Sequence, residues 1–520
     1  MYGHVLSGGL RGIESFLVRV EADVSNGLPC MEMVGLLAGE VREAKERVRV
    51  AMKNTGLTLP VAHITVSLSP ADVRKAGNAY DLPIAVAILL SMGKLPERCA
   101  EKTLIVGELG LDGELRPVSG VLPMVMRALK EGVRDVLVPL ENGEEAAMLS
   151  EARVFPAQSL KEATELLRAS EAEREKAGEK MRQKIREIHT LKNSAENTKK
   201  ISPKRPDFSE VKGQSAARRA AEIAAAGFHH LLLVGSPGAG KTMIASRLSG
   251  ILPPLSMEEA LEVTAIRSVA GLVKQGEGIA RERPFLAPHH TVTKAALTGG
   301  GMGIRPGALS LAHKGVLFLD ELTEIRREIL DVLRQPLEEK KIRLSRGAHT
   351  VEYPADILFV GAMNPCPCGY YPDRSKCRCT DSEVRRYLGR ISGPLLDRID
   401  LCVETSEVGY SSLRDAGEGE SSEKIRRRVE RAVKRQQQRY AGTGIRFNAE
   451  LGVKDTDTYC SLGKAEERLL KQAFEKKSLS ARAFHRLLRV ARTIADLDDS
   501  DRITTAHLSE AVGFRSMGAG

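Results

Sequence analysis

One eight-residue segment restricts the possible folds of this chain more than any other. An apolar run at residues 231–234 leads into Gly-Ser-Pro-Gly-Ala-Gly-Lys-Thr at 235–242, and an apolar helical pattern at 243–248 follows. Glycines let the backbone curl so that its N–H groups surround a phosphate, and the following helix adds a favourable dipole. A strand, a glycine-rich loop and a helix in this order predict a phosphate-binding loop in a mostly parallel α/β sheet.

The polar residues of this loop predict ATP and Mg²⁺ as cofactors. Lys241 would place its charge between the β- and γ-phosphates, and the Thr242 hydroxyl would ligate Mg²⁺. A second apolar run, 315–319, ends in Asp320 and Glu321. Asp320 is expected to hold Mg²⁺ through water, and Glu321 to be the base that activates the attacking water. The predicted nucleotide-binding residues are Gly235, Ser236, Pro237, Gly238, Ala239, Gly240, Lys241, Thr242 and Asp320.

These motifs, in this order, resemble those of AAA+ ATPases. The resemblance implies that Asn364, after a third strand, orients the attacking water. Arg398 looks like the arginine finger that reaches a neighbouring subunit's γ-phosphate, and Arg482 looks like the second nucleotide-sensing arginine. The alternative for Arg398 is a local ion pair with Asp397 or Asp400. An arginine that acts across a subunit boundary requires a ring, and the resemblance implies a hexamer.

Composition divides the 520 residues into several units. Residues 1–168 mix β-rich runs with helical patterns. Residues 169–206 are charged and poor in large apolar side chains, so they are predicted to be a linker. The ATPase core is expected at 207–410, with the four-cysteine segment as an insertion, and a helical lid at 420–516.

The first of these units resembles the Lon protease domain, in particular at Val-Gly-Glu-Leu (106–109) and Pro-Val-Ser-Gly (117–120). Lon proteolysis needs a serine that is activated by a lysine. A gapless alignment puts Ala79 and Leu122 at those positions, although Ser67, Ser69 and Lys75 lie nearby. We therefore expect a module without protease activity that docks a partner or positions DNA. The predicted fold class is α/β: an AAA+ P-loop core with a C-terminal helical lid, preceded by a Lon-protease-like α+β domain.

Longer motifs narrow the resemblance to one family. The runs at 288–291 (PHHT), 307–321, 364–369 (NPCPCG) and 392–400 (SGPLLDRID) are similar to magnesium-chelatase-like AAA+ proteins of the ComM/YifB family, and the similarity covers nearly the whole chain. Its best-understood members are ring-shaped DNA motors of natural transformation, which extend heteroduplex by branch migration. The resemblance implies an ATP-driven helicase or branch-migration motor. A metal-inserting chelatase-type motor and a protein-remodelling ATPase remain alternatives.

Basic residues predict where DNA would be contacted. The chain carries 78 Lys and Arg against 68 Asp and Glu, an excess that permits a polyanionic partner. The basic runs at 170–206 and 424–439 are equally compatible with a solvated linker and a solvated helix face. A segment at 340–347 resembles the hairpin that faces DNA in the pore of MCM-type motors, although a purely structural hairpin is the alternative. The candidate DNA contacts are Lys340, Lys341, Arg343 and Arg346.

Four of the eight cysteines lie within fourteen residues, in a C-x-C, eight-residue gap, C-x-C arrangement. Four thiolates at this spacing predict a structural Zn²⁺ site. An iron–sulfur cluster and unligated thiols are the alternatives. The adjacent His289 and His290 are expected in a loop at a subunit contact rather than at a metal. The candidate zinc ligands are Cys366, Cys368, Cys377 and Cys379.

The longest apolar stretch, 82–92, contains Pro83 and is too short to span a bilayer. The first residues show no basic region followed by a long apolar run, so no secretory signal is expected. We therefore expect a cytoplasmic protein with no membrane partner.

Overall fold

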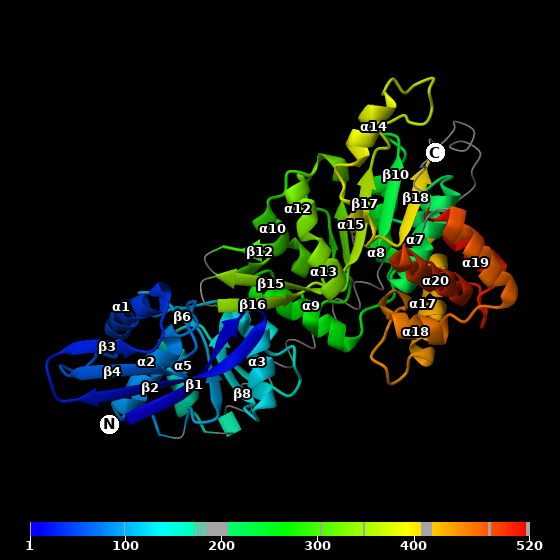
Figure 1. Ribbon diagram of the computed structural model, residues 1–520. Coiled ribbons are helices and arrows are strands. Elements are labelled where there is room, and N and C mark those ends of the chain that lie inside the picture. The colour runs from blue at the N-terminus through cyan, green and yellow to red at the C-terminus, as the bar shows by residue number, and fades with distance from the viewer. Residues whose placement is uncertain are drawn as a thin grey trace.

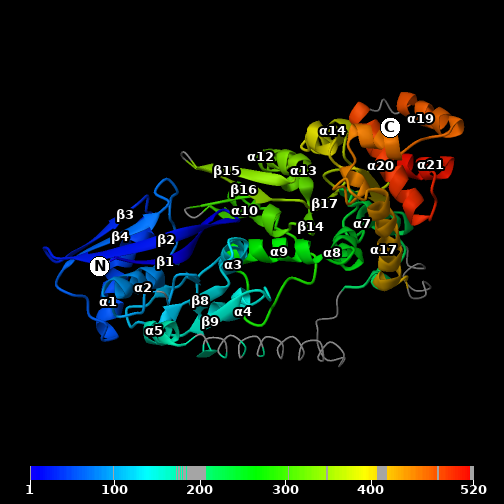
Figure 2. The same cartoon turned by 90° about the horizontal axis from the view of Figure 1, so that it is seen from below.

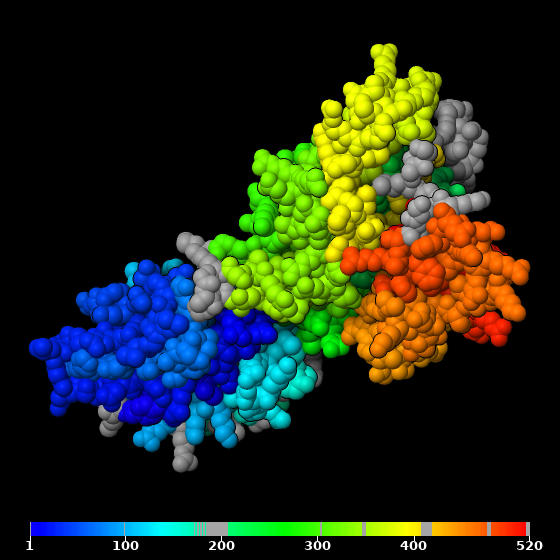
Figure 3. All heavy atoms as spheres, in the orientation of Figure 1, coloured from blue at the N-terminus to red at the C-terminus, as the bar shows by residue number. Residues whose placement is uncertain are grey.

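The computed structural model describes residues 2–170 except Arg98, residues 206–406 except 302–303 and 347–348, residues 419–515 except 477–479, and a few isolated positions between 172 and 183. These residues form three units in a row, with the N-terminal unit at one end and a helical unit at the other (Figures 1 and 3). The predicted linker, 169–206, lies mostly outside the described residues.

The N-terminal unit is built on a seven-stranded mixed sheet of order β3-β4-β2-β1-β5-β8-β9. Helix α2 (Asp81–Ser91) is apolar on all sides and is buried along its whole length, because it packs against the sheet and against α1 (Gly39–Asn54). The strands are β1 (Tyr2–Arg11), β2 (Glu14–Ser25), β3 (Cys30–Val34), β4 (His63–Ser69), β5 (Thr103–Ile105), β8 (Asp135–Pro139) and β9 (Arg153–Ala157). The remaining elements include the short strands β6 (Glu108–Leu109) and β7 (Leu115–Arg116) and the helices α3 (Val121–Lys130), α4 (Gly143–Ala146) and α5 (Leu160–Arg168).

The positions aligned with the Lon dyad lie inside this unit. Ala79 is packed in an apolar cluster with Leu104 and Val106. Leu122 is fully buried, and its amide donates to Glu145 Oε1 at 2.9 Å. The nearby Lys75 is buried and donates to the carbonyl of Pro70. The aligned positions therefore supply neither a nucleophile nor a base.

The central unit contains a five-stranded parallel sheet of order β11-β14-β17-β10-β18. Its strands are short apolar runs, as expected when both faces of a parallel sheet are covered. Alternate side chains enter two cores: Leu231 and Leu233 pack with α7 (Ser215–Gly227) and α8 (Lys241–Ile251), whereas Leu232 faces the opposite side. The strands are β10 (Leu231–Gly235), β11 (Phe285–Leu286), β14 (Val316–Leu319), β17 (Leu358–Met363) and β18 (Leu401–Thr405).

Short helices and two hairpins complete the central unit. The helices are α9 (Met257–Val269), α10 (Lys294–Thr298), α11 (Ala308–Leu311), α12 (Arg327–Val332), α13 (Arg334–Glu339), α14 (Asp381–Leu388) and α15 (Gly393–Leu396). The hairpins are β12–β13 (Gly299–Gly300 and Arg305–Pro306) and β15–β16 (Lys341–Arg346 and His349–Pro354). The second hairpin approaches the N-terminal unit (Figure 1). Gly12, at the β1–β2 turn, has φ +69°, and a Cβ there would lie 2.1 Å from Val351 Cγ1.

Hydrogen bonds join the N-terminal unit to α9. The Gly120 amide donates to the Ser268 carbonyl at 3.0 Å, and the Ser268 hydroxyl donates to the Glu145 carboxylate. Burial raises the pKa of Glu145, and hydrogen bonds from Ser268 and Leu122 offset part of this shift. A buried, hydrogen-bonded carboxylate at the boundary fixes the relative position of α3 and α9.

The C-terminal unit is helical. Helix α17 packs against the central unit, and its buried side chains Ile425, Val429 and Val433 join the core around α7 and α8. Figure 2 shows α17 along the side of this unit. The helices are α17 (Ser422–Arg439), α18 (Val453–Tyr459), α19 (Lys464–Lys476), α20 (Ala481–Leu497) and α21 (Thr505–Gly513). Within the described parts of the chain, none of the helices is both long and apolar enough to cross a membrane.

Candidate active site

The predicted nucleotide residues gather at one edge of the central sheet. Because all five strands run in the same direction, their carboxyl ends meet there, and this is the edge where ligands bind in open α/β sheets. The loop 235–240 follows β10, Asp320 and Glu321 follow β14, and Asn364 follows β17. The pairing of Val234 with Met363 places the loop beside Asn364.

Lys241 lies at the centre of this edge. Its Nζ donates to the carbonyls of Gly235 and Ser236 at 2.7 and 2.9 Å and to Asn364 Oδ1 at 3.1 Å. Burial lowers the pKa of Lys241, and the nearby Asp320 and Glu321 carboxylates oppose that shift. The ammonium group and the side chain of Asn364 thus belong to one polar cluster at the mouth of the loop.

The magnesium ligands predicted from the sequence are also adjacent. Thr242 Oγ1 donates to Asp320 Oδ2 at 2.7 Å, and Asp320 Oδ1 accepts from the Glu321 amide at 2.9 Å. A hydroxyl and a carboxylate this close suit a divalent cation with oxygen ligands. Gly238 and Gly240 both have φ +79°, which is the left-handed backbone that the phosphate-cradling turn requires.

Glu321 makes a contact that sequence reasoning missed. Its Oε2 lies 3.0 Å from Nδ1 of His290, which follows β11, the neighbour of β14 in the sheet. Glu321 also has φ +50°, an uncommon conformation for a residue with a side chain, and such residues cluster at functional sites. The sequence predicts His290 in a loop at a subunit contact and does not indicate that it contacts Glu321. Its position at the end of a strand on the same sheet edge was the signal that could have placed it beside Glu321.

Arg398 lies at the opposite edge of the sheet. It precedes β18, whose amino end lies beside His230 at the start of β10. Five strand residues separate this edge from the phosphate-binding loop, a distance of about 15 Å, which exceeds the length of an arginine side chain. Arg398 is therefore too far away to contact a nucleotide in its own loop.

Among the described residues, Arg398 is paired with neither Asp397 nor Asp400. Its guanidinium contacts Glu338 of α13 and donates to the carbonyl of Pro394 at 2.8 Å. Arg482 Nη2 lies 4.0 Å from the same Glu338 carboxylate, so the two candidate nucleotide-sensing arginines are on one face. Glu338 is another residue that sequence reasoning did not single out.

Asp400 is instead part of the core. Its Oδ2 accepts from the His230 amide at 3.2 Å, and Oδ1 lies 3.6 Å from Arg486. Burial raises the pKa of Asp400, but the hydrogen bond from His229 and the charge of Arg486 outweigh it and hold the pKa well below its usual value. The ionised carboxylate joins β18 to β10 and to α20.

The candidate DNA residues divide into two groups. Lys341 and Arg343 are on the outer face of β15 and pair across the hairpin with Glu352 at 3.1 and 2.6 Å. Both remain substantially exposed, whereas Ile342 and Leu344 point into the core. The backbone of Arg346 is in β15, but its side chain lies outside the described residues.

Lys340 has a different environment, just before β15. Its Nζ contacts Glu450 at 2.5 Å and Asp356 at 3.2 Å, and Asp356 also accepts from Lys314 at 2.7 Å. Burial raises the pKa of Asp356, but the charges of Lys340 and Lys314 more than offset this effect and hold the pKa at about 2. The charge of Lys340 is therefore already balanced by carboxylates of its own chain.

The basic residues at 424–439 also fall into two groups, which face different sides of α17. Arg428, Arg435 and Arg439 form ion pairs with carboxylates of the same chain. The exposed basic residues recur every three or four positions and therefore form one stripe along α17, in which Arg427 pairs with Glu423 at 2.5 Å. They are Lys424, Arg427, Arg431 and Lys434.

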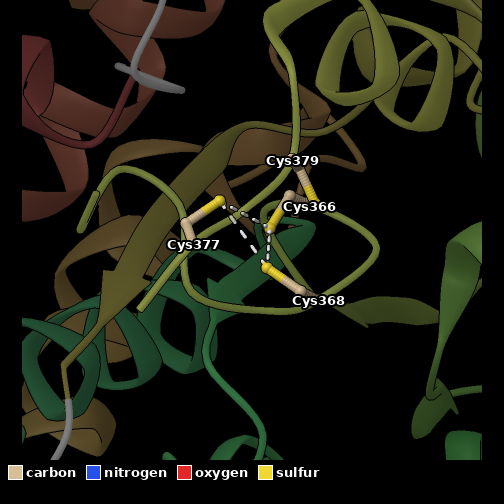
Figure 4. Close-up of side chains that lie close together, drawn as sticks. All are labelled: Cys366, Cys368, Cys377 and Cys379. Carbon is tan, nitrogen blue, oxygen red and sulfur yellow. Dashed lines mark hydrogen bonds between the residues drawn. The ribbon is translucent and has the colours of Figure 1, made fainter. Parts of the chain in front are cut away.

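The four clustered cysteines converge on one point (Figure 4). Their Sγ atoms all lie within 4.8 Å of one another, with separations of 3.3 Å between Cys366 and Cys368 and 3.7 Å between Cys366 and Cys377. Tetrahedral zinc with Zn–S bonds of ~2.3 Å requires S···S distances of about 3.8 Å, so the arrangement fits a single ion. Amides of Gly369 and Tyr371 donate to Cys366 Sγ at 3.2 and 3.4 Å.

A phosphate-binding loop, an acidic strand end and a polar residue on the intervening strand define the class of protein as an AAA-type P-loop ATPase. Comparison with protein families agrees. Residues 207–413 match the family described as magnesium chelatase, subunit ChlI. Residues 20–142 match subunit ChlI of Mg-chelatase, and residues 419–515 match the C-terminal part of that subunit.

Full-length relatives define the family more closely. The chain is 40% identical over 516 residues to competence protein ComM of Haemophilus influenzae, covering 99% of this chain and 97% of that protein. It is 41% identical over 508 residues to YifB of Escherichia coli, covering 97% and 95%. The chain therefore belongs to the ComM/YifB family of Mg-chelatase ChlI-like proteins.

A partial similarity links the chain to Lon. Over 233 residues it is 27% identical to Lon protease 2 of Bacillus subtilis, which covers 39% of this chain and 40% of that protein.

Proposed function

We propose that this protein is a ring-shaped, ATP-driven motor that moves on DNA, of the helicase or branch-migration type. The single observation that carries the proposal is the outward basic face of hairpin β15–β16, which carries Lys341 and Arg343 on an element attached to an ATPase sheet. The similarity to competence protein ComM supports the same partner.

The ion pairs on the hairpin do not prevent DNA binding. Exposed pairs of this kind contribute only about 0–1 kcal/mol each, so a phosphate can replace Glu352 at little cost. Phosphate contacts carry no sequence information, which suits a motor that must move along any sequence. Arg305 of β13 is also exposed, on the adjacent hairpin β12–β13. The two hairpins are joined by the Tyr353 hydroxyl, which donates to the Ile304 carbonyl at 2.5 Å.

The proposed mechanism uses residues at both edges of the sheet. Lys241 and the loop amides bind the phosphates of ATP, and Thr242 and Asp320 would hold Mg²⁺, which neutralises phosphate charge. Glu321 accepts a proton from the attacking water, and Asn364 orients that water. Arg398 lies beyond reach of its own loop, so in the proposed ring it stabilises the γ-phosphate of a neighbouring subunit, with Arg482 on the same face.

The zinc site has a structural role in this proposal. Cys366, Cys368, Cys377 and Cys379 would hold Zn²⁺ in a closed tetrahedral site with no position for substrate. The N-terminal unit would support the hairpin, since its β1–β2 turn contacts Val351 at Gly12.

DNA binding tests the partner assignment directly. We expect labelled single-stranded and branched DNA to bind in the presence of a non-hydrolysable ATP analogue, and affinity to fall steeply with salt. Binding to neither DNA, from protein that still hydrolyses ATP, would refute the partner assignment and leave a chelatase-type or protein-remodelling motor.

A further inference from the structure

The four-cysteine loop lies directly against the phosphate-binding loop. Gly369 has φ +88°, and a Cβ at this position would lie 2.4 Å from Cδ and 2.9 Å from Cγ of Pro237. Only a residue without a side chain allows this approach. Pro237 is the central residue of the segment that encloses the phosphates, so the position of the cysteine loop affects the shape of that segment.

The same loop begins at Asn364. This residue accepts from Lys241 Nζ at 3.1 Å and stands only two positions before Cys366, which is fully buried. The Gly369 amide donates both to the Cys366 carbonyl at 3.0 Å and to its sulfur at 3.2 Å. Cys366 therefore holds Gly369 directly and anchors the chain two residues after Asn364.

On its other side the cysteine cluster holds α14. Thr380 follows Cys379 directly and caps the helix, and Val384 packs in one apolar cluster with Cys366 and Cys377. The end of α14 then contacts the turn after Glu321. The Thr323 hydroxyl donates to Tyr387 Oη at 2.6 Å, and Arg390 Nη1 donates to the Thr323 carbonyl at 3.1 Å.

The segment between β17 and α14 has no helix or strand to hold it in place. Four thiolates at these distances repel one another, and a bound cation turns this repulsion into a crosslink among residues 366–379. A metal at this point would fix three parts of the ATP site together: the phosphate-binding loop, the residue that orients water and the turn after the acidic strand.

We propose that the metal-bound cysteine loop is a positioning element of the ATP site, which holds Pro237 and Asn364 in the nucleotide-binding arrangement through Gly369 and Cys366. Loss of the metal lowers nucleotide affinity. This inference does not depend on DNA, and it assigns a task in nucleotide binding to a site that would otherwise only stabilise the fold.

The first test separates the contact from the metal. Gly369→Ala puts a methyl group against Pro237 and leaves all four thiolates in place. We expect about one Zn²⁺ per chain by elemental analysis and a Kd for a fluorescent ATP analogue raised about 10-fold or more, the scale of outer-shell effects at metal sites. Gly442→Ala is the matched control, because Gly442 has φ +82° but no atom within 4 Å of its Cβ position.

The second test removes the metal. Cys368→Ser should lose zinc and show the same rise in Kd, whereas Cys30→Ser, at an exposed cysteine of β3, should change neither. Chelation of wild-type protein should weaken binding, and added Zn²⁺ should restore it. Circular dichroism reports whether each variant is folded. Wild-type nucleotide affinity in folded Gly369→Ala, or in folded metal-free protein, overturns the proposal.

Discussion

Arg398 gives the sharpest prediction about assembly. It stands at the amino edge of the parallel sheet, about 15 Å from the loop that holds Lys241, so the proposed mechanism assigns it to the nucleotide of another subunit. Arg398→Ala should bind ATP and lose roughly 10³-fold in turnover, as expected for removal of an arginine finger. Lys241→Ala should lose turnover because its own loop no longer holds the phosphates.

Mixing these two inactive variants should restore activity. In a random equimolar ring, half of the sites belong to Arg398→Ala subunits, and half of those face a neighbour that still carries Arg398. About a quarter of wild-type turnover is therefore expected, whatever the ring size. Steady-state phosphate release measures it, and native mass spectrometry of differently tagged variants confirms that mixed rings form. Mixed rings with no more activity than the separate variants would refute the assignment.

Three further predictions concern single contacts. His290→Gln removes the partner of Glu321 and should lower turnover about 10-fold with ATP affinity unchanged, measured by steady-state kinetics and nucleotide titration. The double variant Lys341→Gln/Arg343→Gln should weaken DNA binding and reduce the salt slope, the dependence of log affinity on log salt, by about 2 in fluorescence anisotropy. Asp356→Asn should lower the free energy of unfolding by about 2 kcal/mol at pH 7 in urea titrations, since the pKa of Asp356 falls from 3.8 to about 2 on folding.

Each of these predictions has its own control. For the hairpin, Arg468→Gln/Lys471→Gln removes the same charge from exposed positions of α19, and an equal loss of DNA affinity there would contradict a specific role of the hairpin. For His290, a loss of ATP affinity equal to the loss of turnover would indicate a defect in binding. The pKa of Asp356 is lower in the folded protein than in the unfolded chain. Its contribution to the free energy of unfolding is therefore present above about pH 4, and about half of it remains at pH 3. A difference between variant and wild type that does not shrink on acidification would contradict this origin.

Much of the fold could be predicted from the sequence because its signals are local. The apolar runs at 231–234 and 315–319 became β10 and β14, and the β-rich runs expected within residues 1–168 include β4 and β8. The basic segment at 340–347 contains the first strand of a hairpin, whose second strand is His349–Pro354. Convergence of the four cysteines also followed from their spacing alone, because a short loop keeps them close.

The contacts that sequence reasoning missed join residues far apart in the chain. Glu338 lies sixty positions from Arg398, and nothing in the sequence distinguishes it from its acidic neighbour Glu339. His290 meets Glu321 only because β11 and β14 are adjacent in the sheet. Likewise, the sequence shows Gly369 as an ordinary turn residue, whereas its contact with Pro237 depends on how β17 and β10 pair. Which of these distant residues meet depends on the order of the strands in the sheet, and no single segment of the sequence shows that order.

In the proposed function, Glu321 and its neighbours form an ATPase that works on DNA. The most direct measurement is ATP hydrolysis with and without single-stranded and branched DNA, using Glu321→Gln as the inactive control. We predict several-fold stimulation of wild-type turnover by DNA, while Glu321→Gln binds ATP without hydrolysing it. Wild-type turnover that is indifferent to every DNA structure, or undiminished turnover by Glu321→Gln, would contradict the claim.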